Sequence, residues 1–277
     1  MEFKGIGIGE SNFKGLRIRK NYFIDKSMYI KDIIDNQSRV LLVTRPRRFG
    51  KTLNMSMLKY FFDCEIKDSK ELFEGLKIME QEEKYTSKLC AYPCIYLTMK
   101  DLNVSTYEYM LMQLKTAMME IYFEKRYILD GEVSEAERET YNRMMAAKAN
   151  EMELLNSVKL LSKLLYRYYN KPVMLFIDEY DVPIQTAYVK KYYEQAMDFL
   201  KAFYGSTFKD NPYLEKTVLT GVSRVAKESI FSGANNFDVY TVLNDEFADD
   251  FGITEDEMEK VMKDFNVEDD KEEIKKW

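Results

Sequence analysis

The chain has 277 residues, enough for one large domain or two small ones. It is 46% hydrophobic and 32% charged, so it can build a core and is not disordered throughout. It contains no histidine, which excludes Ser-His-Asp and Cys-His catalysis and any zinc site with histidine ligands. The net charge of -6 argues against sequence-independent binding of nucleic acid, although a local basic patch could still support it.

The three cysteines, Cys64, Cys90 and Cys94, are too few for a disulfide framework and do not have the spacing of a zinc ribbon. The N-terminal MEFKGIGIG lacks the apolar stretch of a signal peptide, and the longest apolar run, residues 173–177, is too short to span a membrane. We therefore expect a soluble, cytoplasmic protein with no membrane partner. The early GIGIGE follows no predicted strand and has little weight as a dinucleotide site.

In chain order, apolar runs typical of strands occupy residues 40–43, 93–99, 173–178, 217–221 and 239–243. Helical spacing of apolar residues predicts helices over 53–62, 107–127, 157–169, 192–208 and 254–265, the last with Thr254 and Glu257 as a capping box. The charged stretch 130–153 predicts an exposed helical hairpin, whose polar face we interpret as a solvated surface. Strands that alternate with helices predict an α/β fold around a mainly parallel sheet. Ligands of such sheets bind at the carboxyl ends of the strands.

Gly50-Lys51-Thr52 lies between a predicted strand and a predicted helix, as in the second half of a phosphate-binding loop. Gly50 lets the backbone approach a phosphate, and the N–H groups that open the helix face the anion. In this interpretation Lys51 binds the β- and γ-phosphates and the Thr52 hydroxyl coordinates Mg²⁺. A chance match remains the alternative for three residues taken alone.

The first half of this loop departs from the usual pattern, which has a glycine five residues before Gly50. Arg45 occupies that position, and the predicted nucleotide-binding residues are Arg45, Pro46, Arg47, Arg48, Phe49, Gly50, Lys51 and Thr52. We expect the three arginines to add positive charge beside the phosphates and Pro46 to stiffen the turn.

Asp178-Glu179 ends the apolar run 173–178, an arrangement typical of the metal and water site of nucleoside triphosphatases. Asp178 would hold Mg²⁺, and Glu179 would act as the general base toward water. An acidic strand end that caps a turn is the alternative. Because both motifs occur in order and on suitable elements, the sequence predicts a nucleotide site.

The predicted strand 217–221 places further polar residues at the same edge. Thr220 is the first candidate to sense the γ-phosphate and Ser223 the second. Arg224 is either a residue that stabilises developing charge or a partner in an ion pair. Asp181 lies near the predicted metal or caps the following turn.

These residues resemble the AAA-ATPase-like family, a branch of the P-loop ATPases with an extra strand and a catalytic glutamate. The resemblance rests on RPRRFGKT (45–52), FIDEYD (176–181), Thr220-Gly221 with Arg224, residues 228–236 and Phe251-Gly252-Ile253-Thr254. Relatives share the arginine at position 45. The resemblance implies a three-layer P-loop NTPase sandwich over residues 1–245, with a helical insertion at about 105–170. Residues 246–277 would begin a truncated C-terminal helical segment.

Many relatives carry a C-terminal domain that resembles PD-(D/E)XK nucleases; we expect no such domain within residues 1–277, so nuclease activity is not carried over. The resemblance implies binding of ATP and Mg²⁺, with catalytic roles for Glu179, Lys51, Thr220 and Arg224. Hydrolysis would drive a conformational change that a missing module or a protein partner detects. The alternatives are a nucleotide switch or scaffold without hydrolysis, and a nucleic-acid-associated module that uses the loop arginines and the basic segment 14–20.

Overall fold

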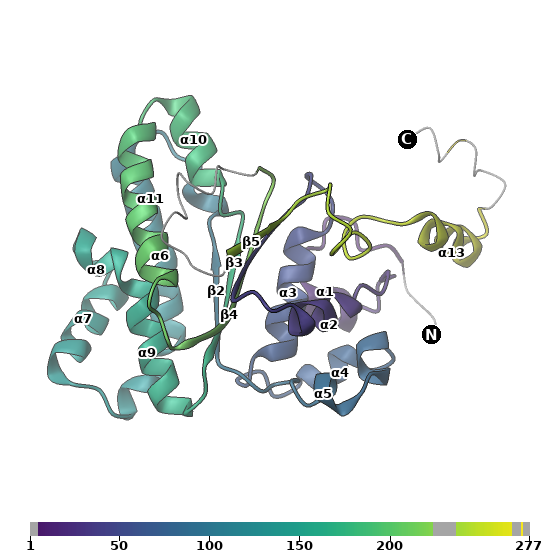
Figure 1. Ribbon diagram of the computed structural model, residues 1–277, viewed down its shortest axis with the longest axis horizontal. Helices are drawn as coiled ribbons and strands as arrows, with labels where there is room; N and C mark the ends of the chain where they lie inside the picture. The colour runs from purple at the N-terminus through teal and green to yellow at the C-terminus, as the bar shows by residue number, and fades with distance from the viewer. Residues whose placement is uncertain (1–4, 224–236, 268–272, 274–277) are drawn as a thin grey trace.

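A computed structural model describes residues 5–223, residues 237–267 and residue 273. Its centre is a five-stranded sheet in the order β2-β3-β4-β1-β5, and every pair of neighbouring strands is parallel (Figure 1). The strands are β1 (Val40–Thr44), β2 (Cys94–Thr98), β3 (Val173–Asp178), β4 (Leu214–Gly221) and β5 (Phe237–Tyr240). Strand β4 lies between β1 and β3, so an additional strand separates the strand before the phosphate-type loop from the strand that ends in Asp178-Glu179.

The central strands are buried on both faces, which explains their continuous apolar sequences. Every residue of β1 and β3 is buried. Strand β5 differs from the sequence-based prediction of 239–243, because it begins at Phe237 and ends at Tyr240. Phe237 is buried and pairs with Val40 of β1, whereas Val242 and Leu243 are exposed beyond the strand. The bounds of β5 thus follow from its pairing with β1, and the apolar run VYTVL (239–243) does not predict these bounds.

One face of the sheet is covered by the helices that precede β2 (Figure 1). Helix α3 (Lys51–Phe62) packs against β3, β4 and β2 and fills this layer with Met55, Leu58 and Phe62. The other elements of the layer are α1 (Phe13–Ile18), α2 (Met28–Asp35), α4 (Ser69–Phe73), η1 (Lys77–Glu80) and α5 (Glu83–Thr86).

The opposite face is covered by the helices that lie between β2 and β4 in the chain (Figure 1). Apolar side chains of this layer, such as Leu114, Leu161 and Phe203, form a core with residues of β2, β3 and β4. Its elements are η2 (Lys100–Leu102), α6 (Tyr107–Glu124), η3 (Arg126–Asp130), α7 (Glu135–Met145), α8 (Glu151–Leu155), α9 (Ser157–Tyr169), α10 (Val182–Lys190) and α11 (Tyr193–Phe208). The sequence-based analysis missed α10, whose Pro183 lies in the first turn, where proline is tolerated.

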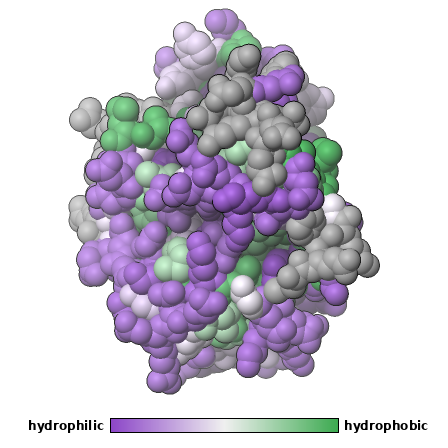
Figure 2. Space-filling model, turned by 90° about the vertical axis from the view of Figure 1, so that its right-hand side faces the viewer, coloured by the Kyte–Doolittle hydropathy of each residue, from purple (hydrophilic) through white to green (hydrophobic). Residues whose placement is uncertain are grey.

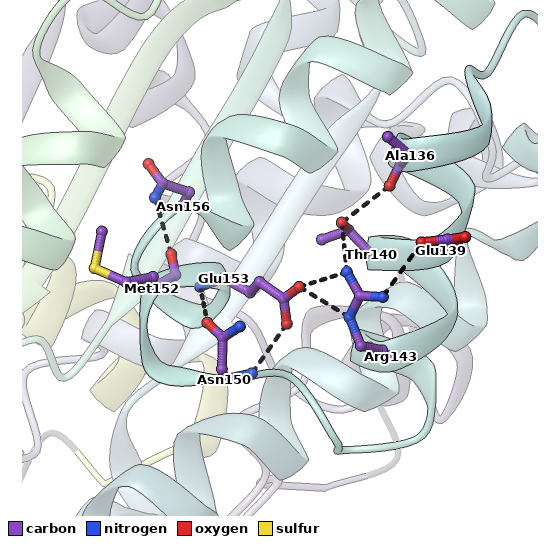
Figure 3. A network of polar contacts seen from close by, with 8 residues as sticks. All are labelled: Ala136, Glu139, Thr140, Arg143, Asn150, Met152, Glu153 and Asn156. Atoms are coloured by element: carbon purple, nitrogen blue, oxygen red, sulfur yellow. Dashed lines mark hydrogen bonds and ion pairs between the residues drawn. The ribbon is translucent and has the colours of Figure 1, made fainter.

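The charged stretch 130–153 contains two short helices joined by polar contacts (Figure 3). Arg143 of α7 donates to Glu153 of α8 from Nε at 2.8 Å and from a terminal nitrogen at 2.6 Å. Glu153 also accepts from the backbone N–H of Asn150 and completes a capping box. The predicted helices are therefore present, and they bury Tyr141, Met144 and Leu154 in the core while their charged faces lie outside.

The chain after β5 returns to the layer that contains α3 and ends in α13 (Glu255–Phe265). Phe247 and Phe251 pack edge-on against Tyr29 in that core. Helix α13 begins with the predicted Thr254–Glu257 capping box. Figure 2 views the molecule from this side, where hydrophilic residues predominate. The division of the chain at residue 245 stays a prediction, although residues 247–251 contribute to the core of the first part.

These layers form an α/β sandwich of the P-loop NTPase type, as the sequence predicted. No helix among the described residues is both long and apolar enough to cross a membrane.

Candidate functional site

The loop between β1 and α3 has the backbone of an anion-binding site. Gly50 has φ 78° and Arg48 has φ 69°, both in the left-handed region. Alternating backbone conformations of this kind turn successive N–H groups toward one point. Among the described residues, the N–H groups of residues 47–50 donate no backbone hydrogen bond. These four residues are also exposed. The loop and the first turn of α3 can therefore present N–H donors to a bound anion.

Lys51 is the first residue of α3, and its side chain is directed back over the loop. Lys51 is a buried residue, and its ammonium group donates to the carbonyl oxygen of Pro46 at 2.8 Å. Burial lowers the pKa of Lys51, whereas the charges of Asp178, Glu179 and Asp181 raise it. The structure thus brings the loop lysine within electrostatic reach of acids that follow it by more than a hundred residues.

Asp178 is held by the strand beside it. It is 1% exposed, and its Oδ1 accepts from the Thr220 hydroxyl at 2.5 Å and from the Glu179 N–H at 3.1 Å. Thr220 is fully buried at the end of β4, so its hydroxyl orients Asp178. Thr52 is half-buried at the second position of α3.

Glu179 has an unusual backbone conformation for a residue with a side chain, with φ 55°. Left-handed residues other than glycine cost roughly 1–2 kcal/mol and are frequent at functional sites. Burial, followed by the charge of Asp178, raises the pKa of Glu179, while Lys100 and Lys51 oppose that rise. The half-buried side chain lines a cavity together with Arg47. A carboxyl group of raised pKa at the mouth of a cavity is a suitable general base.

Asp181 supports the turn after β4. Its Oδ2 accepts from the N–H groups of Val222 at 3.1 Å and Ser223 at 2.7 Å. The Tyr180 hydroxyl donates to the Ser223 carbonyl oxygen at 2.7 Å. A Cβ at Gly221 would lie 2.6 Å from Asp181 and 2.7 Å from the Tyr180 ring, so glycine is required for this close approach. Asp181 does not cap α10, the helix that follows it, through its side chain; the carboxylate instead holds the turn at Val222-Ser223 after β4.

The Arg45 side chain departs from the expectation that its charge lies beside the phosphates. Its guanidinium is buried and donates to the carbonyl oxygens of Thr44 at 3.0 Å and Phe247 at 2.8 Å. The group also lies over the Phe251 ring, 5.3 Å from its centroid. Arg45 therefore connects the loop to the segment after β5, and its N–H donates to the carbonyl oxygen of Gly221 at 3.1 Å.

Residues of the C-terminal segment contact the loop in a way that the sequence-based analysis did not assign. The N–H of Gly252 donates to the Phe49 carbonyl oxygen at 3.2 Å, and Asn54 donates to the Asp250 carbonyl oxygen at 2.8 Å. Gly252 has φ 74°, and a Cβ there would lie 3.1 Å from the Phe49 ring. Gly252 was the available signal, because a glycine in a loop often supplies the positive φ of a turn.

The other predicted cations have separate locations. Arg47 and Arg48 are exposed, and Arg224 lies outside the described residues. In the basic segment 14–20, Arg17 donates to the carbonyl oxygens of Leu72 and Glu74. Arg17 is thus engaged by backbone carbonyl oxygens.

A parallel α/β sheet with a glycine-lysine loop after β1 and an acidic pair after β3 is the arrangement of the P-loop NTPase class of folds. The family described as "Predicted AAA-ATPase" matches residues 6–231, and the chain belongs to this family. The family description supports nucleotide binding.

A relative from Azotobacter chroococcum mcd 1, described as "Uncharacterized protein in vnfD 5'region", is 24% identical over 283 residues. The alignment covers 100% of this chain and 48% of the relative, so the chain spans about half the length of that protein. No solved structure matches the chain.

Proposed function

We propose that the chain binds Mg²⁺-ATP and hydrolyses it. The observation that carries this proposal is that Lys51, which opens α3 after β1, lies at the same carboxyl edge of the parallel sheet as the Asp178-Glu179 pair after β3. The phosphates would bind the N–H groups of residues 47–52 and the Lys51 ammonium, which would exchange its bond with Pro46 for the phosphates.

The donors suit a magnesium ion. A carboxylate from Asp178 and a hydroxyl from Thr52 are hard oxygen ligands, and Mg²⁺ usually combines one or two such ligands with substrate phosphates and water. Thr220 fixes the carboxylate through Oδ1. Bound there, the ion would supply positive charge to the phosphate oxygens.

Glu179 would remove a proton from the attacking water while the bond between the β,γ-bridging oxygen and the γ-phosphorus breaks. Because the base must be ionised and its pKa is raised, turnover should increase with pH through that raised pKa. Glu179→Gln should give a flat profile over the same range, measured as phosphate release at constant ionic strength.

Two variants separate binding from turnover. Lys51→Ala should abolish binding of a non-hydrolysable ATP analogue, measured by calorimetry with Mg²⁺. Glu179→Gln should retain binding and lose turnover by about 10²–10⁴-fold, the usual contribution of a general base. Glu83→Gln, an exposed acid on α5, is the matched control and should behave as wild type. Wild-type turnover in Glu179→Gln would refute the base assignment, and absence of turnover in the wild type would favour a non-hydrolysing switch.

We further propose that the C-terminal segment detects the nucleotide. Phe49 and Asn54 contact Gly252 and Asp250 directly, so movement of the loop would change the position of α13. A protein partner or a further module would respond to this movement. Amide hydrogen exchange of residues 247–265 should slow when the analogue binds. Unchanged exchange would contradict this route.

A further inference from the structure

A cavity of about 480 Å³ lies beside the candidate nucleotide site at the carboxyl edge of the sheet. Glu179 follows β3 and Lys100 follows β2, so the cavity lies over the β2–β3 side, whereas the loop 45–50 follows β1. Its lining residues are Arg47, Lys100, Asn103, Glu179, Val182, Gln185, Thr186, Val189 and Lys190. Gly50, Lys51 and Thr52 do not line it. Glu179 is therefore placed between two neighbouring sites.

The lining has an excess of positive charge. Arg47, Lys100 and Lys190 come from the loop, from η2 and from the end of α10, and Glu179 is the single acid among the lining residues. Within the described part of the chain, none of these three cations forms an ion pair. Cations from separate elements that converge on one cavity favour an anion there.

The neutral lining residues add donors and an apolar wall. Asn103 Oδ1 accepts from the Thr186 hydroxyl at 3.2 Å, so the amide N–H₂ is the group that Asn103 can offer to a ligand. Val182 and Val189 supply apolar surface on the α10 side. The volume lies within the range of about 300–1,000 Å³ that is typical of small-molecule sites.

We propose that this cavity binds a small phosphomonoester beside Glu179, at a site separate from the triphosphate. A phosphomonoester carries roughly two negative charges near neutral pH, which three cations and an amide can compensate. Its carbon part would contact the two valines, and its hydroxyl groups would face Glu179. This inference depends on the proposed function in one respect, because it assumes that the neighbouring loop binds the nucleotide.

The dimensions favour a small ligand over nucleic acid. A nucleic-acid strand is bound along an extended basic groove that neutralises several phosphates. Here three cations without ion pairs line one partly open cavity, whereas Arg45 and Arg17, two of the other candidate cations, are engaged by backbone carbonyl oxygens.

The test is a calorimetric titration with ribose 5-phosphate as the probe, with the loop first saturated by Mg²⁺ and a non-hydrolysable ATP analogue. We expect binding that weakens at least tenfold in Lys100→Ala and in Lys190→Ala. Lys191→Ala is the matched control, because Lys191 lies next to Lys190 but contacts the Tyr188 ring and does not line the cavity. Analogue affinity should be similar in all three variants, which also shows that they fold.

Three results would overturn the proposal: no binding of ribose 5-phosphate, equal binding by wild type and the cavity variants, or tighter binding of a single-stranded oligonucleotide. If inorganic phosphate binds as tightly as ribose 5-phosphate, the cavity is a site for free phosphate, and the proposal of a phosphomonoester is refuted. If the analogue itself fails to bind, the proposed function fails, and titration of the sugar phosphate into Lys51→Ala then tests the cavity independently.

Discussion

Replacement of Arg45 distinguishes a structural arginine from one that binds phosphate. Its guanidinium donates short hydrogen bonds to the carbonyl oxygens of Phe247 at 2.8 Å and Thr44 at 3.0 Å. Two longer hydrogen bonds reach the carbonyl oxygens of Tyr240 at 3.4 Å and Glu246 at 3.5 Å. Hydrogen bonds to a charged group contribute about 1.5–3 kcal/mol each. Arg45→Ala removes the two shorter hydrogen bonds and leaves a cavity, so the free energy of unfolding should fall by about 3–5 kcal/mol.

The assay is urea unfolding followed by circular dichroism. With a denaturant dependence of about 3 kcal/mol per M, the midpoint should fall by about 1 M or more. Arg45→Lys keeps the charge but not the planar fork, so we expect about half of that loss. Arg47→Ala, which removes an exposed arginine of the same loop, should change stability by less than about 0.5 kcal/mol.

Nucleotide affinity decides between the two interpretations of Arg45. If the side chain anchors the loop to the C-terminal segment, folded Arg45→Ala should lose less affinity than Lys51→Ala. Wild-type stability combined with complete loss of nucleotide binding would refute the anchoring role. It would indicate instead that the guanidinium contacts the phosphates.

Two further predictions concern the supports of the site. Gly221→Ala places a methyl group 2.6 Å from Asp181, so we expect a loss of roughly 1–3 kcal/mol in urea unfolding, and wild-type stability would contradict the close approach. Burial and the neighbouring Asp32 raise the pKa of Asp250 to about 7, so the folded state binds the additional proton and stability should fall as pH rises from about 4 to about 7. Asp250→Asn should flatten that dependence, measured as unfolding midpoints across this range, and an unchanged slope would exclude Asp250 as its source.

Local patterns in the sequence were sufficient for the class of fold and for the residues of the candidate site. The VMLFID run specified a strand buried on both faces, and Gly50-Lys51-Thr52 specified a turn into a helix, because these properties depend on neighbouring residues. The parallel order of the strands then placed Lys51 and Asp178 at one edge, as expected from the alternation of strands and helices.

Contacts between distant segments determined the features that the sequence did not reveal. Arg45 could be assigned to the phosphates from its position in the loop, but its partner Phe247 lies about 200 residues later in the chain. The sequence predicted Thr220 as a sensor of the γ-phosphate but did not reveal that β4 places its hydroxyl on Asp178. The sequence alone thus predicted the fold class, which the structure confirms, and supplied the candidate residues of the proposed site. Only the tertiary structure decided where each side chain is directed, because that depends on which donors and acceptors meet when separate segments pack.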